Sequence, residues 1–405
     1  AGTVTDYTYD PFNDLLKSVG VDGKTVAYEY NTNGSLKNIL SPSGTDYRFN
    51  YDNFGRTDSI YVGNRLLSSM SYRDKYSSLL SRLDYGNGDY RTYSYDNQDR
   101  LIGEYANGNQ ITSYVYNKSG QLSQKQDLLA GTLARFRYDL SGRTLGMSVS
   151  KNGSEYISLA NVYDKGIDRL VGQYVELPGI KSLNYAYKYG KTAPDENFGE
   201  AIYGVSLNGT TNLSYGYDHL GRLSERKLDV TDGGFTTRYF YEEIGENGTS
   251  PLVTKLESGE DTYEYTYDKL GNITSIRKNG AVVESYTYDA LGQLKTVTRG
   301  TDVWEYTYDN GGNILSVTKN GVTEKTYTYG DSEWKDLLTQ FDEQTITYDE
   351  IGNPFQYRDG MNFTWASGRQ LSTITKGTDS ISYAYDAEGL RTRKTVNGIT
   401  TDYYW

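Results

Sequence analysis

The chain has 405 residues, a formal net charge of −12 and no cysteine. The acidic balance argues against nucleic-acid binding, which needs a basic stripe, and the lack of cysteine excludes disulfides and cysteine-based metal or redox sites. No run of about 20 apolar residues is present, so we expect no membrane-spanning helix. The 43 tyrosines and 44 glycines favour strands joined by tight turns.

The N-terminal stretch "AGTVTDYTYD" has no signal-peptide pattern and contains a Tyr-Asp pair at once. We therefore expect it to be an internal cut through a longer protein. Tyr-Asp or a close variant then recurs along the whole chain, in steps of 20 or 21 residues where the pattern is clearest. The second residue of each pair is Asp10, Asn31, Asp52, Asp96, Asn117, Asp139, Asp164, Asp218, Asp268, Asp289, Asp309, Asp349 and Asp386.

This period predicts one continuous repeat array over residues 1–405, without linkers. We expect regular repeats at 1–188, stretched repeats at 189–252 and regular repeats at 253–405. Each repeat reads as a β-hairpin, because Tyr-x-Tyr places both rings on one face of a strand. Asp then begins a turn, and Gly three residues later suits a left-handed backbone angle. Where Gly is missing, Asn13 or Asp99 is expected to take its place.

A hairpin with a glycine bulge fixes the register of the two strands. Asp is expected opposite the residue just after Gly, as in Asp218 and Arg222, and Tyr opposite the next residue, as in Tyr217 and Leu223. This predicts Tyr and Leu or Ile on one sheet face, and Asp with Arg or Asn on the other. We favour the Tyr/Leu face as the inward one.

The predicted structural motif contains no catalytic, cofactor-binding or metal-binding residue. Its members are Tyr9, Asp10, Tyr51, Asp52, Gly55, Arg56, Tyr95, Asp96, Arg100, Tyr138, Asp139, Gly142, Arg143, Tyr217, Asp218, Gly221, Arg222, Tyr267, Asp268, Gly271, Tyr288, Asp289, Gly292, Tyr308, Asp309, Gly312, Tyr348, Asp349, Gly352, Asn353, Trp365, Tyr385, Asp386 and Gly389.

Candidate chemistry is sparse. The single histidine, His219, occupies a turn position that is Lys269 or Ala290 in other repeats, so we interpret it as a turn residue. With one His and no Cys, the chain has almost none of the side chains that Ser/His/Asp or Cys/His catalysis uses. We therefore expect no enzyme. The acidic turn "DYGNGD" at 84–89 lacks a full calcium-loop signature, so a solvated turn is favoured. Phe363 with Trp365, and Trp304 with Tyr306, are interpreted as packing rows rather than ligand platforms.

The Tyr-Asp period is interrupted at residues 189–205 and 230–252. We expect longer polar loops in these two ranges. Such loops in repeat proteins are most often tolerated insertions and sometimes carry binding.

The C-terminal stretch "WKDLLTQFDEQTITYDEIGNPFQYRDGMNFTWASGRQLSTI", residues 334–374, carries the most specific pattern, followed by "YAYDAEGLRTRKTVNGITTDYYW". With the Tyr-Asp repeats, it resembles the YD-repeat or Rhs family, which includes bacterial polymorphic toxins, toxin-complex shell subunits and teneurins. The resemblance implies a β-hairpin ribbon that spirals into a hollow shell around a C-terminal toxin polypeptide, in a secreted or bacterial cell-surface protein. The family's autoproteolytic aspartates lie beyond this repeat block, so none is carried over.

The fold prediction is therefore all-β, with tandem hairpins in one antiparallel ribbon. Roughly 19 repeats of two strands, at about 4.8 Å per strand, give one to two turns of a spiral. The leading hypothesis for function is a non-enzymatic shell segment that encapsulates and helps deliver a C-terminal toxin or effector. The alternative is an adhesion module that binds glycans or a surface protein through aromatic faces or long loops.

Overall fold

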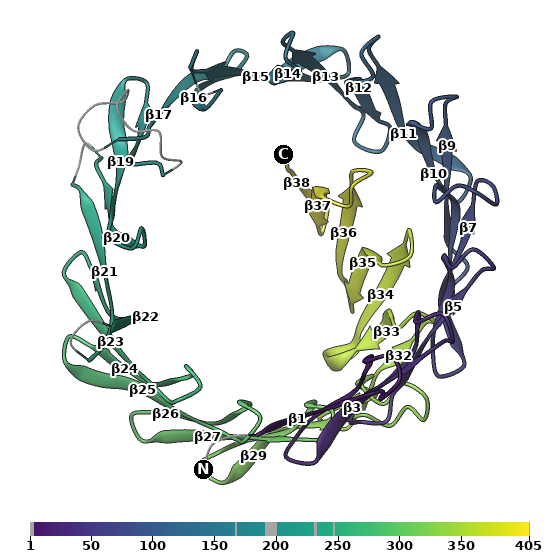
Figure 1. Cartoon of the computed structure of the whole chain (residues 1–405), viewed down its shortest axis with the longest axis vertical. Helices are drawn as coiled ribbons and strands as arrows, with labels where there is room; N and C mark the ends of the chain where they lie inside the picture. The colour runs from purple at the N-terminus through teal and green to yellow at the C-terminus, as the bar shows by residue number, and fades with distance from the viewer. Residues whose placement is uncertain (1–3, 167, 191–200, 231–232, 246–247, 405) are drawn as a thin grey trace.

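The computed structural model describes residues 4–166, 168–190, 201–230, 233–245 and 248–404. Within this part of the chain the fold is all-β, with strands β1–β38 and a single short 3₁₀ segment, η1 (Arg358–Gly360). The strands form a ring, and the last few lie within it when the molecule is viewed down its shortest axis (Figure 1). No helix among the described residues is long and apolar enough to cross a bilayer.

The ring wall is one antiparallel sheet of 31 strands, in which each strand pairs with its neighbour in the chain. Its strands are β1 (Thr5–Tyr9), β2 (Leu16–Val21), β3 (Lys24–Tyr30), β4 (Leu36–Leu40), β5 (Asp46–Tyr51), β6 (Thr57–Val62), β7 (Arg65–Tyr72), β8 (Leu80–Tyr85), β9 (Tyr90–Tyr95), β10 (Leu101–Ala106), β11 (Asn109–Tyr116), β12 (Leu122–Asp127), β13 (Thr132–Tyr138), β14 (Thr144–Lys151), β15 (Ser154–Tyr163), β16 (Leu170–Leu177), β17 (Lys181–Lys188), β18 (Gly204–Leu207), β19 (Thr210–Tyr217), β20 (Leu223–Leu228), β21 (Phe235–Ile244), β22 (Gly248–Ser258), β23 (Asp261–Tyr267), β24 (Ile273–Lys278), β25 (Ala281–Tyr288), β26 (Leu294–Arg299), β27 (Asp302–Tyr308), β28 (Ile314–Lys319), β29 (Val322–Thr328), β30 (Gln340–Phe341) and β31 (Gln344–Thr345).

Two kinds of turn alternate along this ribbon and form its two rims. The Tyr-Asp rim consists of the Asp-x-x-Gly turns, such as Asp268–Gly271, where Gly271 has φ 84°. The return rim consists of the intervening turns, such as Asn279-Gly280, where Asn279 has φ 50° and Gly280 φ 82°. Both residues of such a two-residue turn have positive φ, which asparagine and glycine adopt at low cost.

The ribbon continues after one turn of the ring as a second, seven-stranded antiparallel sheet. Its strands are β32 (Thr347–Tyr348), β33 (Pro354–Tyr357), β34 (Met361–Ala366), β35 (Gln370–Lys376), β36 (Asp379–Tyr385), β37 (Arg391–Val396) and β38 (Ile399–Asp402). The ladder breaks at Ile346, which is buried between β31 and β32. We call strands β1–β26 the first winding and strands β27–β38 the second winding.

The Tyr/Leu face of the sheet points into the ring. One cavity of about 470 Å³ is lined by Tyr114, Phe136 and Met147 of the wall and by Glu388 and Tyr404 of the second winding. Tyr114 and Phe136 share a face with Tyr116 and Tyr138 because strand side chains alternate. Strands β34–β38 lie within the ring in this view, and the Tyr/Leu face of the wall lines the cavity with residues of this segment, so this face is the inner one, as the sequence favoured (Figure 1).

One of two predictions for turn residues needs correction. The first repeat places the positive φ at Asp14 rather than Asn13, because the backbone carbonyl of Asp10 accepts from the N–H of Asp14 and the turn is one residue longer. Asp99, by contrast, has φ 65°, as predicted.

The stretched repeats also differ from the loops that were expected. Within 230–252, β21 and β22 form a long hairpin rather than a polar loop, and only 231–232 and 246–247 of this range lie outside the described residues. In 189–205 the predicted loop falls mainly on 191–200, which also lie outside the described residues.

Candidate functional site: the inner wall and the seam of the ring

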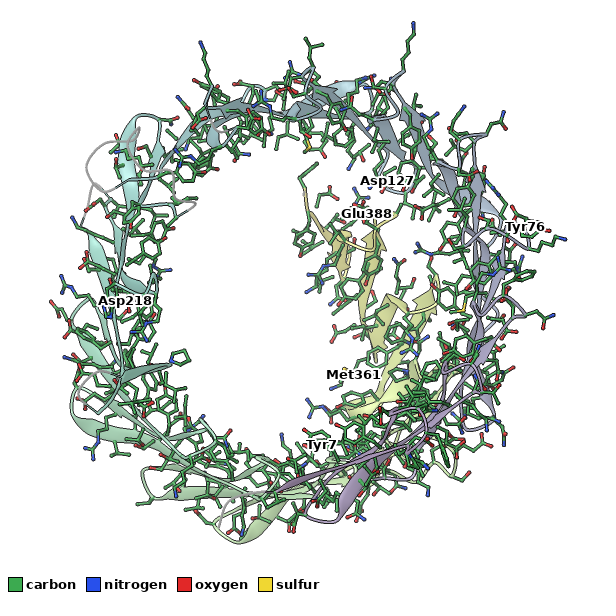
Figure 2. All side chains as sticks on the ribbon, viewed as in Figure 1. Tyr7, Tyr76, Asp127, Asp218, Met361 and Glu388 are labelled. Carbon is green, nitrogen blue, oxygen red and sulfur yellow. The ribbon has the colours of Figure 1, made fainter. Side chains whose placement is uncertain are left out.

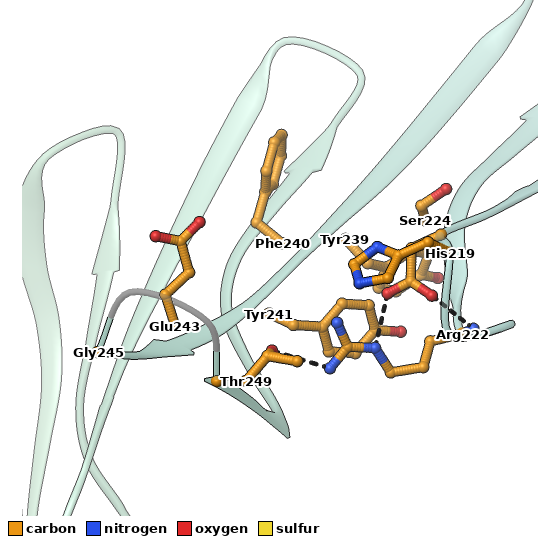
Figure 3. A pocket seen from close by; sticks show the side chains of 11 residues that line it. His219, Arg222, Ser224, Tyr239, Phe240, Tyr241, Glu243, Gly245 and Thr249 are labelled. Atoms are coloured by element: carbon orange, nitrogen blue, oxygen red, sulfur yellow. Dashed lines mark hydrogen bonds and ion pairs between the residues drawn. The ribbon is translucent and has the colours of Figure 1, made fainter.

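The Tyr-Asp turn is held together by its aspartate, as the repeat at Asp218 shows (Figure 3). One carboxylate oxygen accepts hydrogen bonds from the N–H groups of Leu220 and Arg222, both at 2.9 Å. The other oxygen accepts from Nε of Arg222 at 2.7 Å. Asp218 and Arg222 therefore lie opposite each other, and Tyr217 pairs with Leu223, which confirms the predicted register.

The residue after Gly supplies the partner in other repeats as well. Arg56, Arg100 and Arg143 bind Asp52, Asp96 and Asp139, and Asn272, Asn313 and Asn353 bind Asp268, Asp309 and Asp349. The side-chain hydrogen bond from Arg100 holds the pKa of Asp96 below its ordinary value, and the one from Asn272 does the same for Asp268. These aspartates stay ionised because the turn donates to them.

The arginine side chains do not stay on the face opposite the tyrosines, which corrects the prediction. The guanidinium of Arg222 lies over the ring of Tyr241 in the next repeat, 3.9 Å from its centroid. Arg56 over Tyr72, Arg100 over Tyr116, Arg143 over Tyr163 and Arg169 over Tyr189 repeat this contact. Each arginine thus joins the aspartate of its own hairpin to the tyrosine of the next, a cation–π contact that sequence spacing alone does not show.

The tyrosine before Asp makes a second contact between neighbouring hairpins. Its hydroxyl donates to a backbone carbonyl of the preceding repeat. The distance between the two oxygens is 2.6–3.0 Å in every pair given below except Tyr348–Leu338. The pairs are Tyr30–Leu16, Tyr51–Leu36, Tyr72–Thr57, Tyr95–Leu80, Tyr116–Leu101, Tyr138–Leu122, Tyr163–Thr144, Tyr189–Leu170, Tyr217–Ile202, Tyr241–Leu223, Tyr267–Val253, Tyr288–Ile273, Tyr308–Leu294, Tyr348–Leu338 and Tyr385–Leu371.

Some predicted motif residues sit in different surroundings. Tyr9 lies in β1, at the free edge of the sheet, and is 56% exposed. Trp365 occupies a tyrosine position, and its Nε1–H donates to the carbonyl of Pro354 at 2.7 Å, in place of a hydroxyl. His219 lies at a turn and lines a cavity of about 560 Å³ with Arg222 and Tyr239 (Figure 3).

The return rim carries its own contact between neighbouring hairpins. In the turn at Asn279, the side-chain oxygen accepts from the N–H of Thr262, and the side-chain nitrogen donates to Asp261. Asn107, Asn320 and Asn397 make the same pair of bonds. Neighbouring hairpins are therefore joined by side chains at both rims.

The two windings meet along a seam, where the Tyr-Asp rim of the second rests on the return rim of the first. The contacts join residues 260 to 289 positions apart. They are Lys24–Asp309, Tyr47–Asp336, Asn64–Glu333, Arg65–Asp331, Asn87–Asp349, Asn87–Gly368, Asp89–Gly368, Lys125–Glu388 and Asp127–Ala387. The turn at 84–89, predicted to be solvated, therefore lies in this seam.

Sequence reasoning did not identify the seam residues. Asp331 and Asp336 lie in the segment between β29 and β30, and both carboxylates face the first winding. The signal in the sequence is that residues 331–338 carry no strand alternation. Residues 334–337 form a turn closed by the N–H of Leu337 and the carbonyl of Trp334.

An aromatic row crosses the break between the two sheets. The rings of Tyr327, Phe341, Tyr357, Phe363 and Trp365 follow one another with centroids 5.1–6.5 Å apart. Such spacing is typical of packed aromatic pairs. The row continues the inner face where the backbone ladder is interrupted.

These features agree with a family model described as the teneurin YD-shell, which matches residues 261–405. Over these residues the resemblance to YD-repeat shells is confirmed. The fold of the chain is that of solved toxin-complex shells: a TcdB2-TccC3 structure has a TM-score of 0.77 at 16% identity over 97% of this chain. A TcdB2-TccC3-Cdc42 structure has a TM-score of 0.74 at 16% identity over 97% of this chain.

Two curated proteins are similar to this chain in sequence. Double-stranded DNA deaminase toxin A of Burkholderia cenocepacia (strain H111) is 24% identical over 291 residues, 68% of this chain and 19% of the relative. The tRNA nuclease WapA of Bacillus subtilis (strain 168) is 39% identical over 72 residues, 17% of this chain and 3% of the relative. This chain spans about a quarter of each of these two solved chains, 24% and 23%, and less of the curated relatives.

Proposed function

We propose that this chain is a structural segment of a hollow shell that encloses a polypeptide effector of the same protein and helps deliver it. The shell belongs, in this proposal, to a secreted or surface-exposed bacterial protein, and residues 1–405 act as one continuous array. The role requires no chemical step by this chain.

The ring carries this proposal. Its sheet completes a full turn and continues into a second winding that is joined to the first by side-chain contacts. The side chains in Figure 2 line the wall and the second sheet, and leave an open space between β20–β25 and β34–β38. A continuous wall suits containment, because within each of the two sheets of the described chain the strands pair with their neighbours and only the end strands stay open.

The inner surface suits a polypeptide. Tyrosine rings and aliphatic side chains line it, while hydroxyl pairs such as Thr287–Thr296 and Thr307–Ser316 lie on the opposite, outer face. Two relatives are named as toxins or nucleases that act on nucleic acid, although this chain is acidic. An effector in another part of the protein reconciles those two facts.

Limited proteolysis of the full-length protein that contains this chain tests the proposal. Encapsulation predicts that an effector segment resists trypsin while the wall is intact. The same segment should become cleavable when paired seam substitutions, Arg65→Ala with Asn87→Ala, loosen the windings. Rapid cleavage of the effector inside an intact wall contradicts encapsulation.

The adhesion alternative predicts a different result. The isolated folded chain would then be retained on an immobilised glycan or surface protein. A glycan array with the 405-residue chain separates the two roles, because a wall segment needs no such ligand.

A further inference from the structure

The last complete Tyr-Asp repeat departs from the others at one position. The residue after Gly389 is Leu390, whereas Arg, Asn, Gln or Ser follows the turn glycine in the other repeats and the longer first turn has Leu15 at this place. The Asp386 carboxylate accepts from the N–H groups of Glu388 and Leu390, at 3.0 and 2.8 Å. Among the described residues, no side chain donates to Asp386. This aspartate therefore lacks the side-chain donor that Arg222 provides to Asp218 and Asn272 provides to Asp268.

A second carboxylate lies beside it across the seam. Asp127, in a return turn of the first winding, is only 6% exposed. Its Oδ2 accepts from the N–H of Ala387, the residue next to Asp386, at 2.7 Å, and its Oδ1 accepts from the N–H of Ala130 at 2.8 Å. Figure 2 shows Asp127 and Glu388 side by side where the second sheet approaches the wall.

The cations around this pair have other partners. Lys125 binds Glu388, Lys151 lies over the ring of Tyr404, and the guanidinium of Arg391 lies over the rings of Tyr383 and Tyr403. The remaining ionisable groups that line the same cavity of about 470 Å³ are Tyr114, Tyr156 and Glu388. The cavity gives a proton access to the two aspartates.

We propose that Asp127 and Asp386 form a proton-dependent latch, which holds β36–β38 against the wall more tightly when the pair carries one proton than when both carboxylates are ionised. Two like charges at close range repel, and one shared proton removes the repulsion. The latch does not depend on what the shell encloses.

The electrostatic surroundings agree with this geometry. Burial, and then the charge of Asp127, raise the pKa of Asp386, whereas the pKa of its counterpart Asp268 is lowered. A carboxyl group with a raised folded-state pKa stabilises the fold most at low pH, and this stability is lost as pH rises through the raised pKa. The latch should therefore close on mild acidification and loosen towards neutral pH.

Hydrogen exchange of the full chain tests the latch, with rates corrected for the intrinsic effect of pH. We expect the amides of residues 379–402 to open less often at about pH 4.5 than at about pH 8. The opening equilibrium should change about tenfold for each unit by which the pKa of Asp386 differs between the closed and the open seam. Asp386→Asn keeps an acceptor for the turn and imitates the protonated state. It should remove the pH dependence and keep 379–402 protected at neutral pH.

Two further variants make the outcome decisive. Leu390→Asn supplies the amide that Asn272 provides to Asp268, so it should weaken the pH dependence without removing the carboxylate. Asp268→Asn makes the same change in an ordinary repeat and should leave the exchange of 379–402 unaltered. The latch is wrong if wild-type protection is equal at both pH values, if Asp386→Asn keeps the dependence, or if Asp268→Asn abolishes it.

Discussion

The hydroxyl of Tyr288 donates a hydrogen bond to the carbonyl of Ile273 at 2.8 Å, at a place where the backbone ladder has ended. Strands β24 and β25 pair only as far as Ser275 and Ser285. Towards the Tyr-Asp rim the two strands separate, and the tyrosine side chain spans the gap. The sheet can therefore open at one rim while the carbonyl stays satisfied, which lets a flat ribbon bend into a ring.

Removing this hydroxyl should weaken the junction between two hairpins. In Tyr288→Phe, the carbonyl of Ile273 loses a donor in a half-buried position. We expect a cost of about 0.5–1.5 kcal/mol, and amide exchange of residues 273–288 that is a few-fold faster.

The control for this prediction is Tyr76→Phe, because Tyr76 is 82% exposed in a surface turn. Its loss of a hydroxyl should leave exchange unchanged throughout the chain. Equal effects of the two substitutions would show that the Tyr288 hydroxyl does not join the hairpins.

The turn aspartates should make the wall sensitive to strong acid. The side-chain hydrogen bond from Asn272 is the leading cause that lowers the pKa of Asp268. A lowered folded-state pKa gives stability that is complete above the unfolded value of about 3.8 and is lost as pH falls through the lowered value.

Asn272→Leu removes that hydrogen bond and tests the sign. The variant should unfold at lower urea concentration than the wild type at pH 7, and the difference should shrink as pH falls through the lowered pKa of Asp268, because this carboxyl group is then protonated in both proteins. A difference that grows on acidification would contradict this assignment of the charge.

The local hairpin follows from the sequence, while its neighbours do not. Asp218 and Arg222 are four residues apart, so turn geometry alone places them together. The contact of Arg222 with Tyr241 depends on how strongly consecutive hairpins are bent towards each other. The contact of Lys125 with Glu388 depends on the circumference of the whole ring, because it joins positions 263 residues apart. Repeat period and turn chemistry do not determine that circumference.

The ion pair between Arg65 and Asp331 should hold the start of the second winding. The two side chains are 27% and 13% exposed, so Arg65→Ala leaves a largely buried carboxylate without its cation. We expect a cost of about 1.5–3 kcal/mol, read as faster proteolysis and exchange in residues 330–338.

An exposed pair provides the comparison for this seam contact. Arg393 and Asp402 are 52% and 34% exposed, so Arg393→Ala should cost less than about 1 kcal/mol. In a double-mutant cycle, the loss of unfolding free energy in Arg65→Ala with Asp331→Ala should be smaller than the sum of the losses in the two single variants. Simple additivity would show that the pair contributes nothing to the seam.

The seam should also depend on apolar packing at one turn position. Ile351 and Leu220 both lie two residues after the turn aspartate, but Ile351 is 0% exposed and Leu220 is 58% exposed. The difference arises because the turn of Ile351 rests on the first winding, where a methyl group of Ile351 approaches Gly86. Ile351→Ala should therefore cost about 2–5 kcal/mol, since it leaves a cavity between the windings.

Leu220→Ala is the matched control, and it should change stability by no more than about 0.5 kcal/mol because nothing packs over an exposed turn. Exchange in β32–β35 should rise sharply in Ile351→Ala only. If both variants retained the wild-type exchange, the second winding would not be docked through this turn, and the contacts at Asp349 and Gly368 would have to hold it instead.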